Sequence, residues 1–226
     1  MSAFGKLWPF ASEATHLRRA YAAWAPLYDV GPGNPLQRAN DAALAVCIPT
    51  APEHGVVVDV ACGTGRHAVL LQARGWRRRF GFDLSPEMIA RANGYAGLAV
   101  ADLRAVPSRP VELVVCSLAL GHLSKLDPAL DALCKLVRHR GDLVLSDIHP
   151  LAVASGLKRT CPGEGGHWWK LPHTLHSIER VAAGLEQRGL TPQLISEPAP
   201  EPVLPGEPAR PPLPLVYALR ARRFTD

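Results

Sequence analysis

The feature that most constrains the fold is a β-branched run that ends in a glycine-containing turn. Val56–Val60 reads VVVDV, the turn Ala61–Gly65 follows it, and an apolar stretch at Ala68–Ala73 comes next. A continuous apolar run of this length is typical of a strand buried on both faces of a parallel sheet. The pattern therefore predicts a strand, a tight turn and a helix, the opening unit of an α/β fold.

The same alternation of strands and helices continues along the chain. Further strands are predicted at 79–83, 98–101, 111–117, 143–146, 190–196 and 215–223. Helices are predicted at 13–24, at 35–47, after Ser85-Pro86-Glu87, from Asp127 to Gly141 and at 174–188. Strands that alternate with helices form βαβ units, and their parallel sheets bind ligands beyond the carboxyl ends of the strands.

The length of the chain predicts one domain with internal divisions. We expect a single domain over 1–226, with helices in 1–50, a strand-and-helix core in 51–150 and a C-terminal portion in 151–226. Within that last portion, residues 198–214 hold eight prolines. Proline cannot donate a backbone hydrogen bond, so we expect this segment to be an exposed, partly extended loop.

Composition argues against several classes of protein. The net charge is +5, but the densest basic run, Arg74–Arg79, is interpreted as a solvated surface, so we expect no nucleic-acid partner. No apolar run reaches the roughly 20 residues of a membrane span, and we expect no membrane partner. The five cysteines contain no C-x-x-C pair, which favours reduced thiols, no metal site and a cytoplasmic location.

Acidic residues stand at or near the ends of three successive predicted strands. They are Asp59, Asp83 and Asp102, and the turn after the first strand carries Gly63 and Gly65. Each aspartate alone also fits a turn or a helix cap. Together they predict a polar row at the sheet edge, where carboxylates accept hydrogen bonds from a nucleoside. The turn lacks the third glycine of a dinucleotide fingerprint and suits a zwitterionic ligand better than a pyrophosphate.

These segments resemble a known family. Val57–Leu71 and Gly81–Ala92 resemble the first two motifs of class I S-adenosylmethionine (SAM)-dependent methyltransferases, and Tyr21–Asp29 resembles the N-terminal lid of many members that act on small molecules. His67 stands where the family often has a further glycine. The segments Leu118–Leu123 and Ser146–Pro150 are similar to a bacterial small-molecule branch.

The resemblance implies a fold, a cofactor and a set of binding residues. The fold is a Rossmann-like doubly wound seven-stranded sheet, mostly parallel, with an antiparallel last strand beside the fifth, and the cofactor is SAM. Residues 1–50 would then be a lid, 51–150 the SAM-binding core and 151–226 the acceptor side. The expected cofactor-binding residues are Tyr21, Tyr28, Asp59, Ala61, Gly63, Gly65, Asp83, Leu84, Met88, Asp102, Leu103, Ser117 and Leu118.

Two histidines are the candidates for a general base. His122 follows the fourth predicted strand and His149 follows the fifth, at the mouth where an acceptor would lie. Either one also fits a hydrogen-bonded structural histidine. Methyl transfer depends mainly on the alignment of nucleophile and methyl group, so a base adds to the rate only for acceptors that must lose a proton.

We therefore expect SAM-dependent methyl transfer to an oxygen, nitrogen or carbon atom of a small molecule. One alternative is a SAM-binding module without transfer, because fold alone does not settle activity. A weaker alternative is a nicotinamide-dependent oxidoreductase. The sequence leaves the acceptor and the oligomeric state open.

Overall fold

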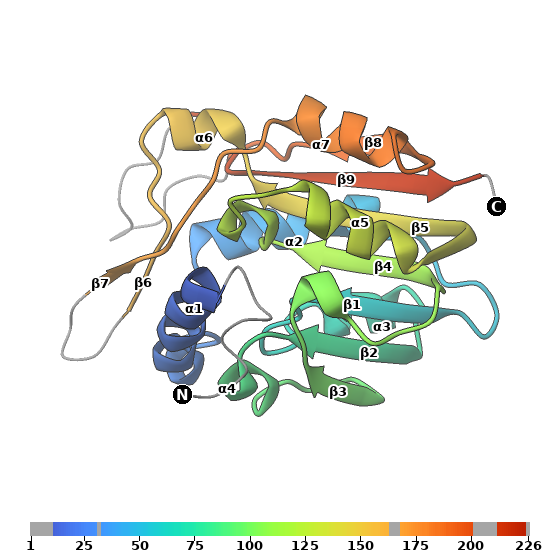
Figure 1. Cartoon of the computed structure of the whole chain (residues 1–226), viewed down its shortest axis with the longest axis horizontal. Coiled ribbons are helices and arrows are strands. Elements are labelled where there is room, and N and C mark those ends of the chain that lie inside the picture. Colours follow the sequence, from blue (N-terminus) through green and yellow to red (C-terminus); the bar gives the residue numbers. More distant parts are fainter. Residues whose placement is uncertain (1–10, 31–32, 163–167, 201–211, 225–226) are drawn as a thin grey trace.

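A computed structural model describes residues 11–30, 33–162, 168–200 and 212–224. Its central element is a seven-stranded sheet in the order β3-β2-β1-β4-β5-β9-β8 (Figure 1). Its strands are β1 (Val56–Val60), β2 (Arg78–Asp83), β3 (Gly97–Val100), β4 (Val111–Ser117), β5 (Val137–Ile148), β8 (Leu190–Ser196) and β9 (Val216–Arg223). Within this order, the neighbouring strands β3, β2, β1, β4 and β5 pair in parallel. β9 runs antiparallel to both β5 and β8. The expected α/β class with a mostly parallel sheet and an antiparallel last strand is confirmed.

Helices cover both faces of this sheet. They are α1 (Ala11–Trp24), α2 (Pro35–Cys47), α3 (Ala68–Ala73), α4 (Pro86–Ile89), α5 (Asp127–Lys135), α6 (Pro150–Ala154) and α7 (Ile178–Glu186). Three single turns of 3-10 helix are η2 (Ala25–Leu27), η3 (Leu103–Ala105) and η4 (Leu120–His122). The start of α2 agrees with the signals in its sequence. The Asn34 side chain accepts from the Gln37 N–H, and the Gln37 side chain accepts from the Asn34 N–H. Pro35 occupies the first turn of the helix.

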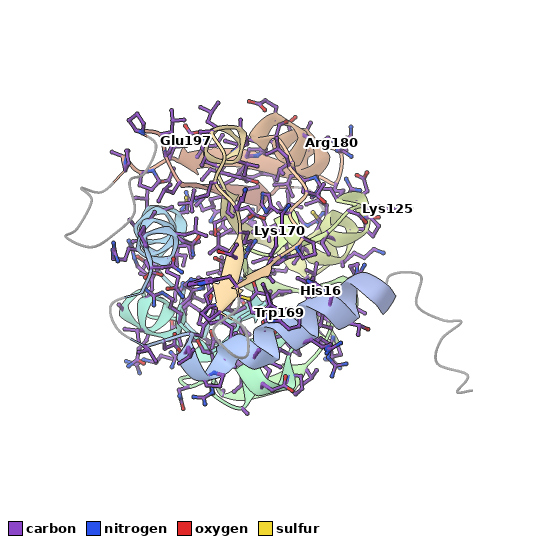
Figure 2. The ribbon with its side chains drawn as sticks, turned by 90° about the vertical axis from the view of Figure 1, so that its left-hand side faces the viewer. His16, Lys125, Trp169, Lys170, Arg180 and Glu197 are labelled. Atoms are coloured by element: carbon purple, nitrogen blue, oxygen red, sulfur yellow. The ribbon has the colours of Figure 1, made fainter. Side chains whose placement is uncertain are left out.

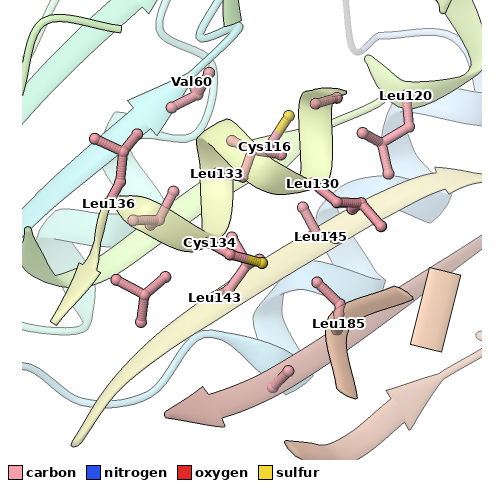
Figure 3. Close-up of a cluster of buried hydrophobic side chains, with 14 of the residues drawn as sticks. Val60, Cys116, Leu120, Leu130, Leu133, Cys134, Leu136, Leu143, Leu145 and Leu185 are labelled. Carbon is pink, nitrogen blue, oxygen red and sulfur yellow. The ribbon is translucent and has the colours of Figure 1, made fainter. Parts of the chain in front are cut away.

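Alternate residues of β1 enter two separate cores. Val58 and Val60 pack with Leu130 and Leu133 of α5 and Leu185 of α7 on one face, the cluster drawn in Figure 3. Val57 faces the other way, where the second core contains Leu44 of α2, Leu71 of α3 and the indole of Trp76. Side chains of a strand alternate between faces, so a β-branched run of this kind fills both cores at once.

The fifth strand is longer than the sequence predicted, and the helix before it is shorter. α5 ends at Lys135, not Gly141, and β5 already begins at Val137, which pairs with Val111. The register shifts between Val111 and Leu113. A Cβ on Gly141 would lie 2.9 Å from the Val111 carbonyl oxygen, so this glycine permits a close strand contact and does not end a helix. Leu136 and Val137 continued the helical apolar spacing, which hid the strand.

The C-terminal third contains more structure than its weak periodicity predicted. The described part of 150–173 includes α6 and an antiparallel two-stranded sheet of β6 (Thr160–Pro162) and β7 (Trp168–Lys170). The helix expected over 174–188 begins only after Ser177, whose hydroxyl caps it by accepting from the Arg180 N–H. Of the proline-rich segment 198–214, residues 201–211 lie outside the described part of the chain.

The first helix lies across the end of the sheet at which the parallel strands finish (Figure 1). Leu17 and Ala20 of α1 pack with Cys161 of β6 and with Leu171, which directly follows β7. Figure 2 views this side and shows His16 beside Trp169, with ring centroids 5.6 Å apart. Two segments far apart in the sequence, α1 and the β6–β7 region, therefore cover the carboxyl ends of the central strands.

Candidate functional site

A pocket lies beneath this cover, at the carboxyl ends of β1, β2, β3 and β4. Its wall is formed by twenty residues, among them Leu17, Arg18, Tyr21, Tyr28, Ala61, Gly63, Asp83, Leu84, Ser85, Met88, Asp102, Leu103, Arg104, Ser117, Leu118, Ala119, His122, Leu123 and Arg159. Eleven of the thirteen residues expected from the sequence to bind a cofactor line this pocket; Asp59 and Gly65 do not. His122 lines it and His149 does not.

The turn after β1 is joined to the end of β2. The Gly63 N–H donates to Oδ2 of Asp83 at 2.8 Å, and the Ser85 N–H donates to Oδ1 of the same carboxylate at 2.9 Å. Gly63 has φ of +56°, and a Cβ there would meet no atom within 4 Å, so the missing side chain leaves open space at the pocket wall. Burial raises the pKa of the Asp83 carboxyl, and backbone hydrogen bonds from Ser85, Gly63 and Leu84 act against that rise.

Asp102 at the end of the third strand is held by its own neighbour. Arg104 donates to Oδ1 at 2.8 Å through Nε and to Oδ2 at 2.6 Å through Nη2. The Arg104 N–H also donates to Oδ1 at 2.8 Å. The carboxylate is nearly buried, and Oδ2 accepts one of these bonds while Oδ1 accepts two, so Oδ2 keeps the freer lone pair for a ligand.

On the other side of the pocket, three polar side chains from distant segments meet. Nη2 of Arg159 donates to the Tyr21 hydroxyl at 3.3 Å and to the Leu118 carbonyl oxygen, and the Tyr21 hydroxyl lies 2.8 Å from Nε2 of His122. Nδ1 of His122 lies 3.0 Å from the Pro172 carbonyl oxygen. Behind them, Oδ1 of Asp147 lies 3.8 Å from Nη1 of Arg159.

The carbonyl partner fixes the tautomer of His122. A carbonyl oxygen only accepts, so Nδ1 carries the proton and Nε2 accepts from the Tyr21 hydroxyl. Burial holds the pKa of His122 well below its usual value, and the nearby Arg159 charge lowers it further. Burial also raises the pKa of the Tyr21 phenol, so both groups are neutral around pH 7.

Three expected site residues have other surroundings. Asp59 is fully buried in β1, where Oδ2 accepts a hydrogen bond of 2.5 Å from the Tyr95 hydroxyl. Gly65 faces Tyr95 and the Asn93 backbone. His149 caps α6 by accepting from the Leu151 N–H, and its Nε2 lies 2.8 Å from Oε1 of Glu197.

A buried polar network lies beside the pocket, under the glycine turn. The Asn40 amide donates to the Ser117 hydroxyl at 2.8 Å and accepts from the Ser146 hydroxyl at 2.6 Å. His67, at the position of the absent family glycine, places Nε2 at 3.2 Å from the same amide. The departure from the family pattern is therefore accommodated by a partner on α2.

Sequence reasoning missed several wall residues, of which Arg159 is the most informative. It lies in the segment without periodicity, and its partners Tyr21 and Leu118 are 138 and 41 residues away. Arg18 and Leu17 carried a usable signal, because they share a helix face with Tyr21. Nothing in the local pattern of 155–160 marked Arg159.

Among the described residues, no group of three or more histidine, cysteine, aspartate or glutamate side chains is arranged to hold a metal ion. Within the same ranges, no helix is long and apolar enough to cross a membrane. All five cysteines are buried and free.

Comparison with known proteins gives a family match. A family model described as a methyltransferase domain matches residues 35–192. Human methyltransferase-like protein 27 is 40% identical over 75 residues, which are 32% of this chain and 31% of that protein. The chain thus spans about a third of the length of this curated relative.

Solved structures share the fold at low sequence identity. The Haloferax volcanii methyltransferase solved in complex with the Trm112 activator superposes with a TM-score of 0.70 at 19% identity, covering 91% of this chain and 98% of that one. Magnesium protoporphyrin IX methyltransferase from Synechocystis, with bound S-adenosylhomocysteine (SAH), has a TM-score of 0.62 at 17% identity, covering 93% and 99%.

Proposed function

The chain belongs to the methyltransferase domain family, and from that premise we propose that it acts as a SAM-dependent methyltransferase. In this proposal the pocket holds SAM beside a small-molecule acceptor, and the methyl group passes from SAM to the acceptor. The observation that carries this proposal is that one pocket joins two chemically different walls. The Gly63–Asp83 wall offers carboxylate and backbone groups, and the Tyr21–His122 wall offers neutral polar groups beside apolar side chains.

The first wall fits a nucleoside with an amino-acid end. Oδ2 of Asp83 accepts from the Gly63 N–H and Oδ1 from the Ser85 N–H, and this carboxylate lines the pocket, where it can also accept from a ribose hydroxyl. Leu84, Met88 and Leu103 supply apolar surface for adenine, and the open space at Gly63 admits the backbone-sized part of the ligand. When bound, SAM supplies a methyl group on a positively charged sulfur.

The second wall supports an acceptor of small size. Leu17, Leu118 and Leu123 line it together with Ala119, and α1 lies over it. The exposed fraction of His122 is only 7%, so a group that reaches it must be nearly enclosed. An enclosed apolar wall with a few polar groups is typical of small-molecule sites.

Residues outside the pocket are assigned supporting parts in this proposal. Asp59 and Gly65 shape the turn after β1 from behind, through Tyr95 and Asn93. His149 is assigned to the start of α6, not to catalysis. No observation in the structure favours the non-catalytic or the nicotinamide alternative.

Calorimetric titration with SAM, SAH and NAD tests the cofactor part. We expect SAM and SAH to bind with micromolar Kd values, NAD not to bind, and Asp83→Asn to lose most of the affinity. Glu53→Gln is the matched control, because the Glu53 side chain is 89% exposed and lies outside the pocket. Equal SAM affinity in Asp83→Asn and the wild type would refute this placement of the cofactor.

A further inference from the structure

The surroundings of His122 bear on which acceptor this pocket takes. A general base needs a free lone pair within hydrogen-bond reach of the proton that it removes. Nε2 of His122 is already used by the Tyr21 hydroxyl at 2.8 Å, and Nδ1 carries the proton directed at the Pro172 carbonyl oxygen. In this arrangement His122 has no site left for a proton from the acceptor.

The charged groups around this wall point the same way. Arg159 is a nearly buried cation whose side chain is 7% exposed, and it donates to the Tyr21 hydroxyl and the Leu118 carbonyl oxygen. The carboxylates that line the described pocket, Asp83 and Asp102, follow β2 and β3, whereas Tyr21, His122 and Arg159 gather beyond β4. Arg159 brings a positive charge to this wall, and its carboxylate partner Asp147 does not line the described pocket.

Asp147 is the carboxylate partner of Arg159. Its Oδ2 accepts from the Gly121 N–H at 2.5 Å and its Oδ1 from the Ile148 N–H at 2.7 Å, and Oδ1 lies 3.8 Å from Nη1 of Arg159. Asp147 does not line the described pocket, whereas Arg159 does. Arg159 also lowers the pKa values of both His122 and His173.

We propose that the acceptor enters this site already ionised, as a small acid with an apolar body whose anionic oxygen is the nucleophile and lies beside Arg159 and Tyr21. The inference rests on the proposed function above. A neutral alcohol would require a base with a pKa near the working pH. A protonated amine would meet the Arg159 cation in a site of low dielectric constant, where like charges repel strongly.

The reaction balances without a proton acceptor. The acceptor oxygen forms its new bond to the methyl carbon, the bond between that carbon and sulfur breaks, and the bonding electron pair stays on sulfur. An anion and a cation thereby become two neutral groups, which a buried site favours. Arg159 and Tyr21 position the anionic oxygen, and no proton leaves the acceptor.

The groups that face His122 come from several elements. They are Tyr21 from α1, Arg159 from the segment before β6, and the Pro172 carbonyl and His173 from the segment after β7, with Asp147 of β5 behind Arg159. None of them needs to change charge for the transfer as proposed. The rate constant kcat for an acid acceptor should therefore stay flat between about pH 6 and pH 8.5.

The test compares charged probes with neutral ones of the same shape. Benzoate, hexanoate and phenylphosphonate are titrated into the protein saturated with SAH, and benzamide, hexanamide and benzyl alcohol serve as neutral partners. We expect the anions to bind at least about tenfold more tightly, and Arg159→Gln to weaken them by about 10-fold to 100-fold, as loss of a hydrogen bond to a charged group implies. Arg159→Lys should restore part of the preference for anions.

One further measurement makes the outcomes distinct. SAM affinity is measured for the wild type and for each variant. If the wild type does not bind SAM, the proposed function fails. If SAM binds normally, the acid titrations test the acceptor class alone. Equal binding of acids and neutral partners, or no binding of any acid up to about 10 mM beside normal SAM binding, would overturn the ionised acceptor. So would an acid preference that is unchanged in Arg159→Gln.

Discussion

The Tyr21 hydroxyl on α1 donates to Nε2 of His122 across 2.8 Å, although 101 residues separate the two in the chain. This hydrogen bond ties the covering helix to the segment after β4, and Arg159 donates to the same hydroxyl. The contact therefore couples the position of α1 to the segments that form the Tyr21–His122 wall of the pocket.

Replacing Tyr21 with phenylalanine should destabilise the protein. The change removes both hydrogen bonds and leaves Nε2 of His122 buried without a donor, which costs about 1–3 kcal/mol in the free energy of unfolding. Denaturant unfolding of Tyr21→Phe, His122→Asn and the double variant measures the coupling between the two residues. Strictly additive effects would show that the hydrogen bond contributes no coupling.

The low pKa of His122 predicts a loss of stability in mild acid. Below about pH 6.5 the unfolded chain binds a proton at this histidine while the folded chain does not, so the free energy of unfolding decreases as pH falls. The slope is at most about 1.4 kcal/mol per pH unit for one group. The lowered pKa of His173 acts in the same direction, whereas the raised pKa values of Asp59 and Asp83 act in the opposite one.

The contribution of His122 is isolated by difference. Unfolding of the wild type and of His122→Gln is followed from about pH 7.5 to pH 5, where the variant should lose less stability. His54→Gln serves as the control because the His54 side chain is 84% exposed. Parallel curves for wild type and His122→Gln would contradict the assignment of a neutral His122.

Tyr95→Phe should destabilise the turn after β1 without reaching the pocket. Tyr95 donates to Oδ2 of Asp59, whose Oδ1 is buried without a hydrogen-bond partner among the described residues. Loss of the donor should cost about 1–3 kcal/mol or more, because the group left behind is a buried carboxyl. Thermal unfolding measures the loss, and SAM affinity should fall less than in Asp83→Asn.

Two glycines of the same turn should respond differently to alanine. Gly65 has φ of +83°, and a Cβ there would lie 2.9 Å from the Asn93 carbonyl oxygen, so Gly65→Ala combines strain with a backbone clash. Gly63→Ala has the strain alone, about 1–2 kcal/mol, but its methyl group enters the pocket. We expect the larger loss of stability in Gly65→Ala and the larger loss of SAM affinity, relative to stability, in Gly63→Ala.

Local signals were enough to predict β1 and the starts of α2 and α4. The β-branched run at Val56–Val60 and the Asn34-Pro35 helix start were both found where the sequence placed them. The capped helix after Ser85 begins at Pro86, also as expected. In each case the residues that define the element are adjacent in sequence, so the pattern contains the whole signal.

Tertiary contacts decided what the sequence could not show. β5 begins at Val137 because that residue pairs with Val111 across the sheet, and no local pattern encodes a partner so far away. The sequence placed Asp59 among the cofactor-binding residues from its position near a strand end, and in the structure it is buried outside the pocket lining and accepts from Tyr95. His149 stood at an equivalent strand end, yet its own helix start and Glu197 engage both nitrogens.

The division of the pocket into two walls has an evolutionary consequence. The Gly63–Asp83 wall comes from the stretch between Ala61 and Arg104. The Tyr21–His122 wall is assembled from α1, the η4 segment and Arg159. Substitutions in the latter segments can accumulate without touching Gly63 or Asp83. Proteins that descend from such a chain can therefore change the molecule that they methylate while they keep the residues that bind the methyl donor.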